Sequence, residues 1–98
     1  MTLRWKPDEN HPRRLSAHVE LDSGYVFAIV GSSHEFPADK DAMARPEQWS
    51  ARIEAWAERT SHARLKLHLW CNSREQAQAW CERKIAELLP IMQAMVQS

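Results

Sequence analysis

The chain has 98 residues, and its 13 Lys and Arg residues balance 13 Asp and Glu residues. This length fits one domain spanning residues 1–98, and 44% hydrophobic with 27% charged residues is typical of a globular protein. No window approaches the roughly 18 consecutive apolar residues of a transmembrane helix, and the first residues lack the apolar stretch of a secretory signal. The composition predicts a cytoplasmic protein without a membrane partner.

The N-terminal residues 1–14 are predicted to form a partly ordered arm. Leu3 and Trp5 alternate with Arg4 and Lys6, which indicates a short strand. Residues 7–14 are polar and contain two prolines, which is typical of a loop.

A β-hairpin is predicted next. Residues 16–21 alternate between apolar and polar side chains, as a half-buried strand does. Residues 25–30 are apolar on both faces, which indicates an interior strand. Gly24 lies between them, and we expect it to supply the positive φ of a tight turn.

A long polar connection follows at residues 31–45, and connections of this length often carry function. Pro46 then suits the first turn of a helix, with Glu47 at its positive end. Four apolar residues continue at helical spacing: Trp49, Ile53, Trp56 and Ala57. The spacing predicts a helix over 46–60.

Residues 64–71 are predicted to form a further strand, with leucines and Cys71 on one face. Its other face carries Lys66, His68 and Trp70. Ser73 with Gln76 three residues later is a capping-box pattern, which starts a second helix. Its apolar stripe is Ala77, Cys81, Ile85, Leu88 and Met92. We expect Pro90 to kink or stop that helix.

These elements predict an α+β fold in the order β-β-β-α-β-α. The segments 25–31, 46–60 and 64–71 form a candidate right-handed βαβ unit with parallel strands. We therefore expect a two-layer α/β sandwich, in which both helices cover one face of a small mixed sheet.

Neither metal nor cofactor binding is predicted. Cys71 and Cys81 are expected to be free, mostly buried thiols, because a bridge needs Cα atoms closer than about 7 Å. The cysteines do not form a C-x-x-C motif, and no two histidines have the i, i+4 spacing of a helical metal site.

A small-ligand site is one hypothesis. It places Ser32, Ser33 and His34 after one strand and Asn72, Ser73 and Arg74 after its parallel neighbour, where α/β sheets bind ligands. The second helix would hold an anion with its free N–H groups, helped by Arg74. We assign no catalytic residues, because adjacent residues such as Ser33 and His34 point apart and cannot act on one another.

A protein interface is the other hypothesis. The outer face of the sheet carries His18, His68 and Trp70, and an exposed tryptophan there favours a partner. Alternatively, the N-terminal segment covers Trp70, with Trp5 beside it. Residues from Cys81 to Met95 step by four and three, like a coiled-coil seam. The further interface candidates near the C-terminus are Leu89, Ile91, Met92, Met95 and Val96.

The leading interpretation is a non-enzymatic binding or accessory protein that forms a homodimer or contacts another protein. One alternative is a small anionic-ligand-binding protein or minor enzyme that uses the 31–45 loop and the start of the second helix. Another is a weak nucleic-acid-binding module whose cations are Arg4, Lys6, Arg13, Arg14, Arg64 and Lys66.

Overall fold

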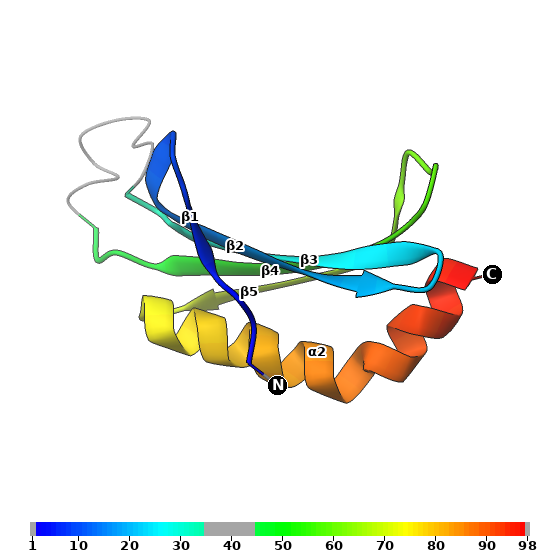
Figure 1. Ribbon diagram of the computed structural model, residues 1–98. Coiled ribbons are helices and arrows are strands. Elements are labelled where there is room, and N and C mark those ends of the chain that lie inside the picture. The colour runs from blue at the N-terminus through cyan, green and yellow to red at the C-terminus, as the bar shows by residue number, and fades with distance from the viewer. Residues whose placement is uncertain (1, 35–44, 98) are drawn as a thin grey trace.

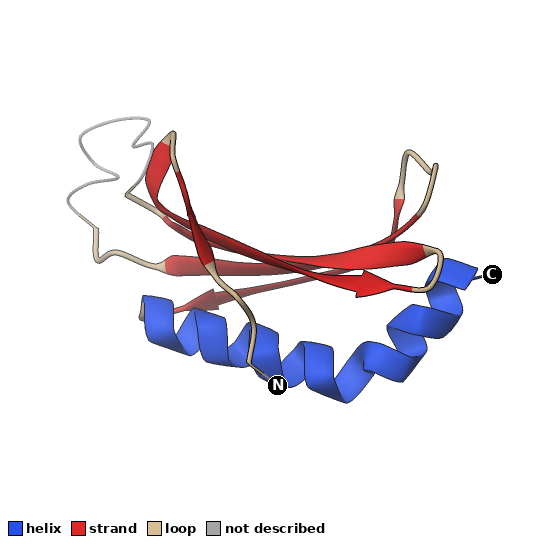
Figure 2. Ribbon diagram, viewed as in Figure 1, coloured by secondary structure: helices blue, strands red, loops and turns tan. Residues whose placement is uncertain are grey.

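The computed structural model describes residues 2–34 and 45–97. Five strands form one sheet in the order β1-β2-β3-β4-β5, and every neighbouring pair is antiparallel. A helix, α2, crosses one face of the sheet, so the fold has two layers (Figures 1 and 2). The elements are β1 (Lys6–Asp8), β2 (His11–Leu21), β3 (Gly24–Ser32), β4 (Trp49–Ala57), β5 (Ala63–Cys71) and α2 (Arg74–Gln97).

The predicted β-β-β-α-β-α order and the mixed sheet are wrong. Residues 46–60, predicted as a helix, contain β4, which pairs with β3 on one side and β5 on the other. The βαβ crossover is therefore absent, and β3 and β5 are separated by an antiparallel strand. Among the described residues one helix, and not two, covers the sheet.

The sequence of β4 fits both periodicities, which explains the error. Trp49 and Ile53 are spaced as in a helix, but alternate residues from Trp49 to Ala57 are also apolar when the alanines are counted. Trp49, Ala51, Ile53, Ala55 and Ala57 are buried in the structure, and the residues between them are not. Pairing on both edges decides in favour of the strand, because tertiary context overrides local propensity.

The hairpin of β2 and β3 is confirmed, with a different turn geometry from the one predicted. The positive φ lies at Ser23 (68°) and not at Gly24. Gly24 is required instead for close packing, because a Cβ there would lie 2.3 Å from the main-chain oxygen of Trp56 and 3.0 Å from Cβ of Val96. Because Gly24 has no side chain, β4 and α2 can approach the start of β3 closely.

Helix α2 begins with Ser73 as its N-cap, as predicted, but the return bond of the capping box reaches Asn72 and not Ser73. The main-chain N–H of Gln76 donates to Oγ of Ser73 (3.1 Å), and Oε1 of Gln76 accepts from the N–H of Asn72 (3.1 Å). The helix continues past Pro90 to Gln97. It bends in its second half rather than stopping, so that its C-terminal part follows the sheet (Figure 1).

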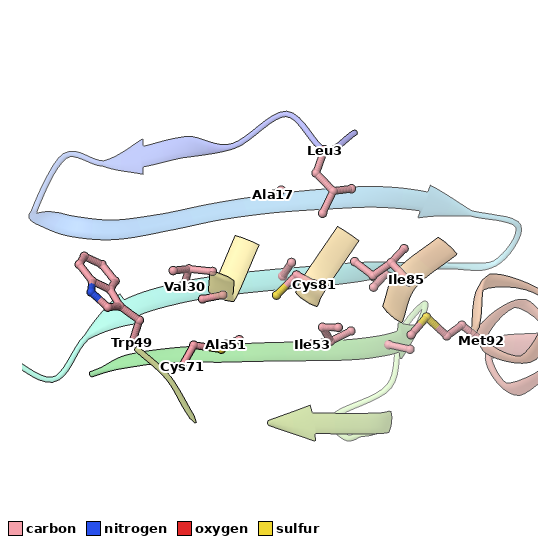
Figure 3. Close-up of a cluster of buried hydrophobic side chains, with 14 of the residues drawn as sticks. Leu3, Ala17, Val30, Trp49, Ala51, Ile53, Cys71, Cys81, Ile85 and Met92 are labelled. Carbon is pink, nitrogen blue, oxygen red and sulfur yellow. The ribbon is translucent and has the colours of Figure 1, made fainter. Parts of the chain in front are cut away.

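The core lies between the sheet and α2 (Figure 3). Val26, Ile53, Cys81, Ile85 and Met92 are among its largest fully buried side chains. Both cysteines are buried and free, as predicted. Each fully buried aliphatic side chain contributes about 1.5–3 kcal/mol to folding, which makes this layer the main source of stability.

The predicted N-terminal arm is part of the sheet and the core. β1 and the start of β2 form a hairpin over the residues predicted as a loop. Leu3 is buried, and Nε1 of Trp5 donates to Glu82 of α2 at 3.2 Å. The arm therefore crosses the edge of the sheet to reach the helix (Figure 1).

Candidate functional site

The face of the sheet opposite α2, here called the open face, is covered by no helix among the described residues (Figure 1). Its side chains alternate along the strands with the buried ones, and the strand register aligns them in rows. One row runs across all five strands: Lys6, Ser16, Ile29, Arg52 and His68.

Aromatic side chains form two clusters on the open face. On β5, the rings of His68 and Trp70 meet edge to face with centroids 5.2 Å apart. On β2 and β3, Phe27 contacts Tyr25 at 5.0 Å and His18 at 6.1 Å. Trp70 is 53% exposed and Phe27 38% exposed. Large apolar surfaces are thus presented to solvent on both sides of the row that contains Arg52.

A shallow hollow of about 410 Å³ lies beside the cluster of His68 and Trp70. Arg14 and Arg52 bring two guanidinium groups to it, and three serines bring hydroxyls. Among the described residues, Arg52 forms no ion pair or side-chain hydrogen bond. The lining is Arg14, Ile29, Gly31, Ser32, Ser33, Ser50, Arg52, His68 and Trp70.

Cations exceed available carboxylates on the open face. Lys6, Arg52 and Lys66 lie on it, and Arg4 lines a second hollow beside Phe27. Among the described residues, Glu20 and Glu54 place carboxylates on the same face, and each forms a side-chain contact there. Oε1 of Glu20 lies 3.0 Å from Nε2 of His18, and Oε1 of Glu54 accepts from Nε1 of Trp56 at 3.0 Å.

Ser50 and His68 form a pair that resembles two members of a catalytic triad. Oγ of Ser50 lies 2.8 Å from Nε2 of His68. Activation of a serine also needs a group that orients the base. No described side chain hydrogen-bonds the other ring nitrogen of His68, and the pair lies on an open surface. We therefore interpret these groups as ligand contacts.

The predicted ligand residues at the end of β3 are engaged in local structure. Oγ of Ser32 donates to the carboxylate of Glu47 and accepts from the N–H of His34, while Oγ of Ser33 accepts from the N–H of Gln48. The hydrogen bond from Ser32, with the charges of Arg13 and His34, holds the pKa of Glu47 below its usual range. Of these three predicted residues, Ser32 and Ser33 also line the hollow on the open face.

The predicted ligand residues at the start of α2 lie at the same end of the strands as Ser32, because Ser32, Trp49 and Cys71 are aligned across β3, β4 and β5. Ser73 caps the helix, and Nη2 of Arg74 lies 3.5 Å from Oε1 of Glu75. Asn72, Ser73 and Arg74 are absent from the lining of the hollow. The two halves of the predicted site therefore have separate surroundings.

The predicted interface residues divide between the two layers. His18, His68 and Trp70 lie on the open face, and Trp70 is not covered by the N-terminal segment, because Trp5 reaches α2 instead. The apolar stripe of α2 packs on its own sheet, and Met92 and Val96 are buried there. Leu89 and Met95 are partly buried, whereas Ile91 is 54% exposed.

Arg52 and Ser50 are site residues that the sequence analysis missed. Both lie in the segment predicted as a helix, where their side chains would have faced solvent away from the sheet. The alternation of Ser50, Arg52 and Glu54 with buried alanines was the signal that could have placed them beside His68.

Comparison with known proteins assigns no function to these residues: no family model, curated protein or solved structure matches the chain. Among the described residues, no three His, Cys, Asp or Glu side chains are grouped as a metal site would require. No described helix is both long enough and apolar enough to span a bilayer.

Proposed function

We propose that this chain is a binding protein for single-stranded nucleic acid, which lies across the open face of the sheet. The observation that carries the proposal is the joint exposure of aromatic rings and cations on that face. Aromatic side chains stack on bases of any sequence, at about 1–3 kcal/mol per base, and Lys and Arg neutralise phosphates. The proposal takes up the nucleic-acid alternative and extends it with Arg52.

The net charge of zero does not oppose this function, because the charges are unevenly distributed. The cations Lys6, Arg52 and Lys66 on the open face outnumber the carboxylates of Glu20 and Glu54 on it, and Arg4 lines a hollow beside Phe27. A strand of phosphates would therefore meet an excess of positive charge there, although the whole chain is neutral.

The dimensions of the face fit a short strand. Four intervals of about 4.8 Å separate the five strands, so the row from Lys6 to His68 spans about 19 Å. This width accommodates a segment of a few nucleotides whose bases stack on aromatic side chains of the protein. Trp70 and Phe27 lie on either side of the row and offer stacking surfaces at two places along the bound nucleic acid.

An apolar protein partner fits this face less well. Arg52 and Glu54 lie on the interior strand β4, and the centres of protein interfaces are depleted of charged residues. A nucleic acid uses the same cations directly. The open face therefore favours a polyanion with aromatic bases over a second protein surface packed face to face.

Binding of a labelled twelve-nucleotide oligothymidylate, followed by fluorescence anisotropy, tests the proposal. We expect Trp70→Ala to weaken binding by roughly tenfold through the loss of stacking. For the unmodified protein, the slope of log K against log salt should be about −3, which corresponds to about four neutralised phosphates. Arg52→Gln should weaken binding as well. Arg74→Gln on α2 and Ile91→Ala, which lie away from the open face, are matched controls that should bind like the unmodified protein.

Three results would contradict the proposal. They are no detectable binding at about 50 mM salt, equal binding by Trp70→Ala and the unmodified protein, or equal affinity for a duplex of the same length. A duplex cannot stack its bases on Trp70, so equal affinity would reduce the effect to general charge attraction.

A further inference from the structure

The outer edge of β5 has features of a pairing site that the open face does not explain. β4 pairs with one side of β5, and no described strand pairs with the other side. An unpaired edge presents a row of free N–H and C=O groups to any compatible strand. Two of the exposed large apolar side chains, Leu69 (41%) and Trp70 (53%), are adjacent on this strand.

The two edges of the sheet differ in how they are protected. β1 has three residues, contains Pro7 and shifts register between Pro7 and Asp8, all of which oppose pairing with a further strand. β5 has nine residues. Its single irregularity lies at Arg64, which has no partner in the register because Leu65 faces Ala55 and Ala63 faces Trp56. From Leu65 to Cys71 the strand is regular.

We propose that β5 pairs with β5 of a second copy of this chain through the regular segment Leu65–Cys71. If the whole segment pairs antiparallel with its copy around a twofold axis, only one register is possible. That register is centred on His68. In that register Leu67 faces the partner's Leu69, and Lys66 faces the partner's Trp70. The inference goes beyond the proposed function: it uses the main-chain edge of β5, although the side chains of Lys66, His68 and Trp70 also belong to the open face.

The side chains of this register are self-complementary. On the face that carries α2, leucine meets leucine, so the half-exposed Leu69 gains an apolar neighbour. On the open face, the ammonium of Lys66 lies beside the ring of the partner's Trp70, a pairing that cation–π attraction favours. Lysine is a residue that often prevents edge pairing, but here the opposite strand supplies a matching group.

The pairing would join the two five-stranded sheets into a single sheet of ten strands. A twofold axis perpendicular to the sheet leaves both open faces on the same side. The homodimer predicted from the sequence is thereby retained as a proposal, with its contact moved from the C-terminal helix to β5. Of the residues predicted for the interface, His68 and Trp70 remain in it.

Light scattering during size-exclusion chromatography, without nucleic acid, tests the oligomeric state. We expect the mass of two chains for the unmodified protein and of one chain for Leu69→Lys, which places a charge against the partner's Leu67. Ile91→Lys is the matched control: Ile91 is exposed to a similar extent but lies on α2, so this variant should stay dimeric. Circular dichroism checks that both variants are folded.

A cysteine scan tests the register. His68→Cys places two thiols on the twofold axis, with Cα atoms about 4.5–5.5 Å apart, and should form an intermolecular disulfide readily. Lys66→Cys places them four residues out of register, about 13 Å apart, and should not. A monomeric unmodified protein, a dimeric Leu69→Lys variant, or cross-linking at position 66 instead of 68 would overturn the proposal.

Discussion

Gly24→Ala is expected to lower the free energy of unfolding by about 3 kcal/mol, the upper end of the cost of overpacking. The added Cβ would lie 2.3 Å from the main-chain oxygen of Trp56, so β3 and β4 must separate where Gly24 pairs with Ala57 at the end of their register. For a domain of this size the loss corresponds to a fall in melting temperature of about 12–24 °C. Thermal unfolding followed by circular dichroism measures it.

Ser23→Gly is the matched control in the same turn. Ser23 has a φ of 68°, a conformation that glycine adopts without steric cost, so this variant should be as stable as the unmodified protein or more stable. If Gly24→Ala and Ser23→Gly shift the melting temperature equally, close packing at Gly24 is not the reason for the effect.

Alkaline pH is expected to destabilise the protein through Cys81. Burial, with smaller contributions from Cys71 and Glu82, raises the pKa of the Cys81 thiol to about 12 from a usual value of 9.0. Below pH 9 both folded and unfolded chains keep this proton, so the thiol does not affect stability there. Between pH 9 and about 12 the unfolded chain releases the proton first, and up to about 4 kcal/mol is lost.

Urea unfolding at about pH 8 and about pH 11 measures this loss, and Cys81→Ala isolates it. The variant should show a smaller decrease in stability between the two pH values than the unmodified protein. Cys71→Ala, which removes the less buried thiol, should keep most of the decrease. If Cys81→Ala loses as much stability with rising pH as the unmodified protein, other groups cause the alkaline effect.

The sequence predicted the elements whose signals are unambiguous. The turn between residues 21 and 24, the strand over 64–71 and the capped start of α2 each depend on local chemistry, and the structure contains all three. The alternation of leucines with Lys66, His68 and Trp70 also placed the last three on the outer face of the sheet, as the register confirms.

The error that changed the fold came from β4, where alanine is compatible with both a helix and a strand. Ala51, Ala55 and Ala57 are small enough to lie under α2, but their size gives a weak hydrophobic signal. Assigning a helix there removed an interior strand from the sheet and made β3 and β5 appear to be parallel neighbours. It also left Ser50, Arg52 and Glu54 out of the predicted outer face. Long-range pairing, which no local window contains, decides this segment.

The candidate site was predictable only in part for the same reason. Trp70, His68 and His18 were recognised as outward-facing, but the cation beside Trp70 and His68 comes from β4. The apolar stripe of α2 was recognised as well and was assigned to an interface. Helix α2 covers the apolar face of its own sheet. Met92 and Val96 are therefore buried within the chain and are not available for an interface.

The order of elements along the chain has a consequence for folding. Each strand pairs with the next one in sequence, and short loops close every hairpin except that of β3 and β4, which residues 33–48 connect. Pairing between neighbours in sequence lowers the entropy cost of closing the sheet. The helix that covers the apolar face follows all five strands. A nascent chain still lacking α2 therefore exposes Val26, Ile53 and their neighbours, and such transiently exposed apolar surface favours aggregation until the helix is made.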